Sequence, residues 1–179
     1  RDRMKFFKKA PETEKIVKSL KDNNNIYLVP AFTGLGAPYW DANARGVLTG
    51  ITRDTSPKEI VRATIEAVAY QTYDLFEAMK HDGLRPKIVK VDGGMVMNNW
   101  FSQFLSDIVN VKVLRPKVQE TTALGAAFMA GLQIGVYKSL KDISKNWHLD
   151  KQFSPKMKNP TRNKLLKGWS AAIKKTLSN

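Results

Sequence analysis

The stretch KIVKVDGGMVMNNWFSQFLSDI, residues 87–108, decides the fold class of this chain. An apolar run ends at an aspartate and two glycines, and a helical pattern begins directly afterwards. Two residues without side chains suit either a tight turn or the close approach of a flat or anionic ligand to the backbone. The stretch therefore predicts a strand at 87–92, a turn at Gly93 and Gly94, and a helix at 97–109.

Strands and helices alternate on both sides of this stretch, which predicts an α/β fold with parallel strand pairing. The clearest helix is 55–79, because Ser56 can cap it and Glu59 completes a capping box. A long loop rich in Gly, Pro and aromatic residues occupies 31–46, and loops of this length are usually functional. The expected helices are 2–9, 12–21, 55–79, 97–109, 121–135 and one near 162–176, and the expected strands are 26–30, 46–52, 87–92 and 111–116.

Composition bounds the class of protein. The 179 residues suit one domain, and a hydrophobic content of 42% is enough for a core. Cysteine is absent, which excludes disulfides and thiolate chemistry and fits a reducing, cytoplasmic compartment. No apolar run is long enough to span a membrane. The first residue is arginine and no signal peptide opens the chain, so we expect a fragment or a trimmed product.

The net charge of +14 raises the possibility of nucleic-acid binding, but its distribution argues against it. Residues 1–25 carry +4 and residues 138–179 carry +9, whereas residues 26–137 carry only +1. We therefore expect a nearly neutral core at 26–137, a basic helical tail at 138–179, and no basic groove built into the fold.

Short motifs leave the ligand of the Gly93–Gly94 turn open. The turn has neither the G-x-G-x-x-G spacing of dinucleotide sites nor the G-K-[ST] of a phosphate-binding loop. A flat base could lie over the glycines, with the amide of Asn98 at a purine edge. A plain tight turn with Asn98 as a helix cap explains the spacing equally well. The only histidines, His81 and His148, lie far apart, and we expect neither catalytic residues nor a metal site in this chain.

Four blocks in unbroken order closely resemble the carboxyl-terminal domain of the FGGY carbohydrate kinases. The resemblance implies an α/β domain of the actin-like ATPase (ribonuclease H-like) class, truncated at its amino-terminal edge. It covers Arg1 to Tyr137, and two of the blocks favour the family members that phosphorylate glycerol. The blocks are VPAFTGLGAPYWDANARGVLTGITRDT (29–55), RATIEAVAYQTYDLFEAM (62–79), VDGGMVMNN (91–99) and ETTALGAAFMAG (120–131).

The resemblance also implies a nucleotide site. It places adenine of ATP or ADP against Gly93 and Gly94, with Asn98 in contact and Ala10 lining the same site. Glycerol, the catalytic carboxylate and most ligands of Mg²⁺ would belong to parts of the family's chain that are absent here. We therefore expect the fragment alone to be inactive and capable of homo-oligomerisation. The alternatives are another FGGY sugar or polyol kinase and a detached binding module.

Overall fold

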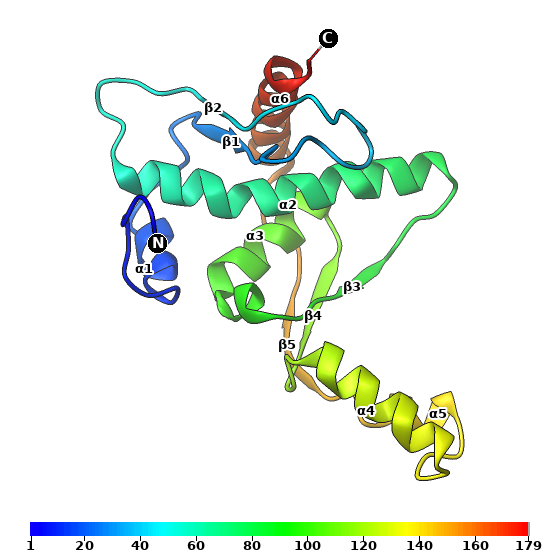
Figure 1. Cartoon of the computed structure of the whole chain (residues 1–179). Coiled ribbons are helices and arrows are strands. Elements are labelled where there is room, and N and C mark those ends of the chain that lie inside the picture. Colours follow the sequence, from blue (N-terminus) through cyan, green and yellow to red (C-terminus); the bar gives the residue numbers. More distant parts are fainter. Residues whose placement is uncertain (179) are drawn as a thin grey trace.

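The computed structural model describes residues 1–178, and helix α2 (Pro57–His81) is its central element. In Figure 1, α2 crosses the whole molecule, with one small sheet on one side and the other sheet on the opposite side. The predicted start of α2 is confirmed: Ser56 Oγ accepts from the Lys58 N–H at 3.2 Å, and the Glu59 carboxylate accepts from the Ser56 N–H at 2.9 Å.

The remaining elements are helices and strands of three to eighteen residues, of which α1, α3 and β1 pack directly against α2. The strands are β1 (Tyr27–Val29), β2 (Val47–Thr49), β3 (Ile88–Lys90), β4 (Lys112–Pro116) and β5 (Leu149–Phe153). The other helices are α1 (Glu12–Lys18), the 3₁₀ turn η1 (Gly94–Met97), α3 (Asn99–Val109), α4 (Thr121–Gln133), α5 (Leu140–Ser144) and α6 (Asn159–Thr176).

The predicted parallel pairing holds for one pair of strands only. Strands β3 and β4 are parallel, with Val89 opposite Val113, and α3 supplies the crossover between them. The pairs β1–β2 and β4–β5 are antiparallel, so the prediction is wrong for them. The loop 31–46 contains no helix and returns the chain beside β1, which produces antiparallel neighbours.

Two predicted elements differ from the structure, and one strand was not predicted. Residues 2–9 form turns and no helix, and Lys5 has a left-handed φ of 54°. A short isolated segment gains too few hydrogen bonds to offset the cost of helix nucleation. The helix expected at 97–109 is divided at Asn98 into η1 and α3. Strand β5 was not predicted, because only Phe153 of its five residues is buried and its sequence lacks an apolar pattern.

The core forms where α2, α3, α6 and β1 meet. The Tyr70 ring on α2 stacks on Trp169 of α6 with centroids 5.2 Å apart, and it meets Phe104 of α3 edge-on at 5.6 Å. Trp169 is only 1% exposed. Helix α6, which lies in the basic stretch 138–179, therefore contributes a buried face to the core and exposes its lysines on the other side.

A buried ionic network fixes the segment between α1 and β1 on α2. Glu66 is fully buried and accepts from Arg62 Nε at 2.7 Å, from Tyr70 Oη at 3.1 Å and from Asn23 Nδ2 at 3.2 Å. Arg62 also donates to the Leu20 carbonyl at 2.8 Å. No buried side-chain nitrogen or oxygen atom in the described residues lacks a hydrogen-bond partner, so burial of these polar groups is tolerated. This network sets the position of α1, which forms one wall of the site described below.

Within residues 1–178, no helix has both the length and the hydrophobicity that crossing a membrane requires.

Candidate functional site

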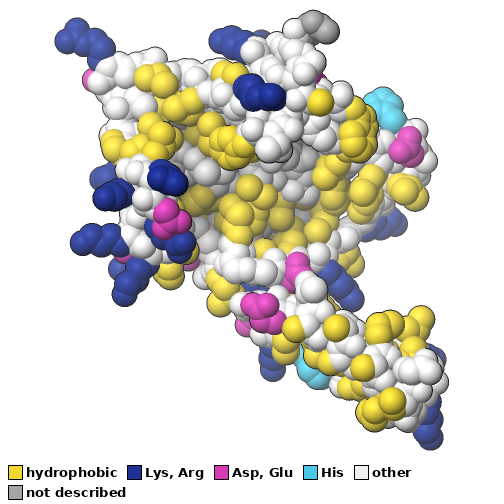
Figure 2. Space-filling view, viewed as in Figure 1, with side chains coloured by type: hydrophobic (Ala, Val, Ile, Leu, Met, Phe, Trp, Pro, Cys, Tyr) yellow, Lys and Arg dark blue, Asp and Glu magenta, His cyan; other side chains and the backbone are white. Residues whose placement is uncertain are grey.

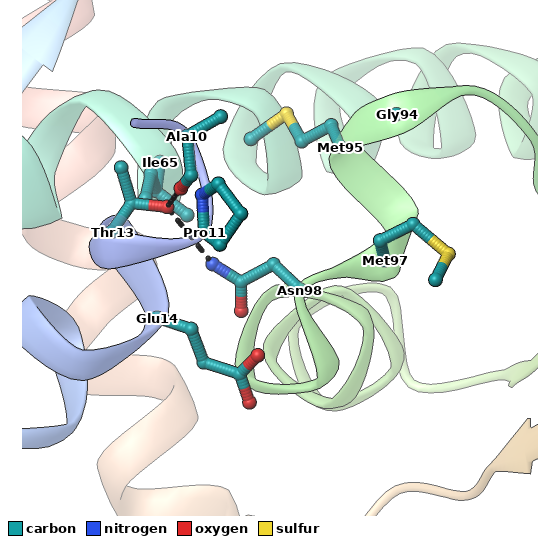
Figure 3. A pocket seen from close by; sticks show the side chains of 9 residues that line it. All are labelled: Ala10, Pro11, Thr13, Glu14, Ile65, Gly94, Met95, Met97 and Asn98. Carbon is teal, nitrogen blue, oxygen red and sulfur yellow. Dashed lines mark hydrogen bonds between the residues drawn. The ribbon is translucent and has the colours of Figure 1, made fainter. Parts of the chain in front are cut away.

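A cavity of about 380 Å³ lies where the start of α1 meets the turn after β3 (Figure 3). This volume is within the range of small-molecule sites, roughly 300 to 1,000 Å³. Three of the four residues predicted for the site contribute to its wall. The lining residues are Ala10, Pro11, Thr13, Glu14, Ile65, Gly94, Met95, Met97 and Asn98.

Gly93 and Gly94 differ in whether their backbone conformation requires glycine. Gly93 has a φ of 83°, which L-residues rarely adopt, and its N–H donates to the Gln119 carbonyl at 3.2 Å. It does not line the cavity. Gly94 has an ordinary φ, and a Cβ added there would meet no atom within 4 Å. The fold therefore requires glycine at 93, whereas at Gly94 a bare backbone keeps open the space in front of the turn.

Asn98 joins the two walls of the site. Its Oδ1 accepts from the Phe101 N–H at 3.0 Å and thereby caps α3. Its Nδ2 donates to Thr13 Oγ1 at 3.4 Å, and Thr13 in turn donates to the Ala10 carbonyl at 2.7 Å (Figure 3). Because the cap occupies the amide oxygen, Asn98 presents its NH₂ group to the cavity. The cap interpretation and the ligand interpretation of Asn98 are therefore compatible.

The rest of the wall combines one anion with apolar side chains. Burial pulls the pKa of Glu14 upward, but Lys18, whose Nζ lies 2.5 Å from Oε1, and the N–H groups at the start of α3 hold it below its usual value. Glu14 is therefore charged at neutral pH and can accept from an amino or hydroxyl group. Met95 and Met97 are 38% and 48% exposed, and their flexible thioethers can adapt to a flat ring.

Several of these lining residues carried no signal in the sequence. Thr13 and Glu14 belong to a short helix that looks like ordinary polar surface, and Ile65 is one of several apolar positions of α2. Only Met95 and Met97 could have been found, because they lie between Gly94 and Asn98 within the same motif.

The described residues contain no metal-binding cluster. Within 1–178, no three His, Asp or Glu side chains come close enough to hold an ion. His81 ends α2 and His148 precedes β5, and neither lines the cavity. The site can thus hold a flat, partly polar ligand, with the Glu14 carboxylate and the Thr13 hydroxyl as its polar side chains beside Asn98.

Comparisons with known proteins agree on one family. The model of the "FGGY family of carbohydrate kinases, C-terminal domain" matches residues 4–134. Glycerol kinase 1 of Pseudomonas aeruginosa is 53% identical over 178 residues, and a glycerol kinase of Clostridium botulinum is 50% identical over the same length. These matches cover 99% of this chain and 36% of each relative. The chain thus spans about a third of the length of the curated relatives that it matches.

Solved structures of the same family have the same fold. The structure of Plasmodium falciparum glycerol kinase with ADP superimposes with a TM-score of 0.85 at 35% identity, over 98% of this chain and 35% of that chain. A ligand-bound xylulose kinase from Lactobacillus acidophilus superimposes with a TM-score of 0.77 at 26% identity, over 96% of this chain and 35% of that chain.

Proposed function

The chain belongs to the FGGY family of carbohydrate kinases, and from this premise we propose that it is the nucleotide-binding portion of a glycerol kinase. Its fold is that of the family, the actin-like ATPase class, as the similarity to two solved kinases establishes. The whole enzyme would transfer the γ-phosphoryl group of ATP to glycerol and release glycerol 3-phosphate and ADP.

One observation carries this proposal: the cavity lies at the glycine turn where the family resemblance expects adenine. The proposed pose lays the ring against the backbone of Gly94, in the turn that Gly93 makes possible, with Ala10 on the opposite wall. The NH₂ group of Asn98 would donate to a ring nitrogen. The two methionines beside Gly94 would cover the apolar edge of the ring.

Glycerol and Mg²⁺ belong to the proposal only through other parts of an FGGY kinase. Phosphoryl transfer depends on positioning the phosphates and on neutralising their charge, commonly with Mg²⁺. The residues described here hold no cluster of three acidic or histidine side chains that would bind the ion. We therefore assign the metal, the phosphates and glycerol to segments outside this match.

Another FGGY kinase is the alternative that the structural comparison brings forward. The xylulose kinase of L. acidophilus shares the fold but is 26% identical, whereas the P. aeruginosa glycerol kinase is 53% identical over nearly the whole chain. The difference favours glycerol. A cytoplasmic location, and the absence of a nucleic-acid partner, are part of the same proposal, the latter because the basic charge lies outside the segment 26–137.

Titration of ADP into the 179-residue chain tests the site, with Gly94→Val as the decisive variant. A Cβ added at 94 meets no protein atom within 4 Å and the φ is ordinary, so we expect the variant to fold normally. Its side chain would enter the space of the ring, and we expect ADP affinity to fall at least about tenfold. Gly36→Val is the matched control, because Gly36 also has an ordinary φ and open surroundings. Unchanged ADP binding in a folded Gly94→Val variant would overturn the pose.

A further inference from the structure

A second cavity, of about 250 Å³, lies where β3 and β4 end, between α4 and the segment that joins α5 to β5. Figure 1 shows α4 and α5 together at this end of the molecule. The volume is slightly below the range of drug-sized sites, so the cavity suits a ligand with a single ring or a short chain. All of its described lining residues differ from those of the cavity at Gly94, so the two cavities are separate.

The direction of Lys90 places this cavity on the side of the sheet that is turned away from the core. Val89 packs against the core beside its strand partner Val113. Successive side chains of a strand point to opposite faces, so Lys90 projects from the other face of the sheet. Lys90 lines the second cavity. Figure 2 shows the hydrophobic side chains of the projecting end that carries α4 and α5.

Half-buried apolar side chains form much of the cavity wall. Leu124 and Phe128 come from successive turns of α4, and Ile143 and Trp147 come from α5 and the residues after it. The Phe128 ring is held edge-on by Tyr137, with the two centroids 5.5 Å apart. Two aromatic rings in one wall favour a ligand that itself carries a ring, because aromatic rings attract one another in offset and edge-on arrangements.

Two exposed lysines, Lys90 and Lys117, give the same cavity a positive charge. The Lys90 Nζ lies 4.3 Å from the centroid of the Trp147 ring, and neither lysine forms an ion pair with any of residues 1–178. None of the described lining residues is acidic. Thr121 also lines the cavity, but its hydroxyl donates to Asp92. An ammonium group is thus available beside the aromatic wall to pair with an anion that is attached to a ring.

We propose that this cavity binds a small aromatic carboxylate. The ring of the ligand lies against Trp147 and Phe128. Its carboxylate pairs with Lys90 and Lys117. A neutral ring would leave the two ammonium groups without a partner, and a small inorganic anion would leave the apolar wall in contact with water. The inference rests on this cavity alone, so it holds or fails independently of the proposed nucleotide site.

Fluorine NMR of the 179-residue chain tests the site, because 5-fluorotryptophan gives each of its four tryptophans a signal. The Trp147→Phe chain identifies the signal of Trp147. Benzoate is the probe, benzylamine supplies a similar ring with a positive charge, and acetate supplies the carboxylate without a ring. Lys90→Gln removes one charge, and Ser144→Phe fills the cavity from an exposed position. Lys87→Gln is the matched control, since Lys87 is exposed just before β3 and does not line the cavity.

We expect benzoate to shift the Trp147 signal saturably, with a Kd of about 1 mM or lower. Lys90→Gln and Ser144→Phe should each raise this Kd at least about fivefold, and Lys87→Gln should leave it unchanged. The proposal is overturned if benzoate produces no saturable shift of Trp147, if benzylamine or acetate acts equally well, or if the Kd is unaltered in a folded Lys90→Gln chain. An unmoved signal from Trp169, which is 1% exposed, shows that a variant is folded, and Lys117→Gln replaces a variant that fails this check.

Discussion

At the scale of single residues, the oxygen and the NH₂ group of the Asn98 side-chain amide have different partners. The oxygen is used by the backbone of α3, at 3.0 Å from the Phe101 nitrogen. The NH₂ group is left for the cavity, where Thr13 holds it at 3.4 Å. The cap contributes to stability, and in the proposed pose the donor contacts the nucleotide, so substitutions can separate the two contributions.

Asn98→Asp should weaken ADP binding and leave stability nearly unchanged. Aspartate caps helices about as well as asparagine, but it replaces the donor with an acceptor. Loss of one hydrogen bond predicts about 1 kcal/mol, which is roughly a fivefold weaker affinity. Asn98→Ala should lose the cap as well, at a cost of about 1 kcal/mol in the free energy of unfolding. Calorimetric titration and urea denaturation measure the two quantities. Equal ADP affinity in the wild-type and Asn98→Asp chains would show that the NH₂ group does not contact the ligand.

At the scale of elements, α6 and the loop 31–46 are both attached to α2 through Asp74. Trp169 Nε1 donates to Asp74 Oδ2 at 2.8 Å, and the Tyr39 hydroxyl faces the same carboxylate. Burial raises the pKa of Asp74 above its usual value, Glu77 acts in the same direction, and the donors of Trp169 and Tyr39 only partly offset it. The junction is therefore held by a carboxylate that binds its proton more tightly in the folded chain.

This pKa shift predicts how stability depends on pH. Between the ordinary value of 3.8 and the raised value, the folded state holds more protons than the unfolded state, so the contribution of Asp74 to stability falls as pH rises. Asp74→Asn keeps an acceptor for Trp169 and removes the charge. The variant should be at least as stable as the wild type at neutral pH, with its advantage shrinking in acid. Urea denaturation between about pH 4 and 7 measures the difference, with the exposed Asp82→Asn as control. A variant less stable at neutral pH would contradict the argument.

Helix α6 also approaches β1 so closely that only glycine fits at the contact. A Cβ on Gly168 would lie 2.2 Å from Tyr27 Oη and 2.4 Å from Cζ. Gly168→Ala gains up to about 1 kcal/mol in helix propensity, but overpacking costs about 1–3 kcal/mol, so we expect a net loss of stability. In a Tyr27→Leu background the cost should fall by more than half, because the obstructing ring is gone. Denaturation of the four chains gives the coupling energy, and additive effects would exclude this contact as the cause.

The same elements show what local sequence could and could not predict. Capping signals and helical spacing predicted α2, and the apolar run before the glycines predicted β3 and its turn, because both depend on neighbours in sequence. The cavity itself could not be predicted from pattern, since Asn98 and Thr13 are 85 positions apart and meet only through tertiary packing. Strand β5 was not predicted for the same reason. Its polar sequence has no strand pattern, and the strand forms through its pairing with β4.

At the scale of the whole molecule, the basic residues and the exposed apolar helix α4 lie in different parts of the chain. The excess of basic residues lies in the first 25 residues and in 138–179, whereas the largely exposed helix α4 carries no charge. Basic ends keep the chain away from other copies, and an apolar face favours a partner of complementary shape. Under the proposed function, this division suits a portion of a kinase whose active site is completed by further chain.

The isolated chain should therefore show no glycerol-dependent release of ADP, while a chimaera should be active. In the chimaera, this chain replaces the matching 178 residues of the P. aeruginosa relative. The described residues contain no cluster that could hold a metal ion, and the proposed function assigns the catalytic base to chain outside this match; acid–base help alone is worth roughly 10² to 10⁴-fold in rate. Within the chimaera, Gly94→Val should raise the KM for ATP at least about tenfold and leave the KM for glycerol nearly unchanged, because only the nucleotide would meet the new side chain. A defect in folding would raise both constants or lower kcat. Turnover by the isolated chain, or equal effects of Gly94→Val on both substrates, would show that the Gly94 turn is not the adenine end of a divided active site.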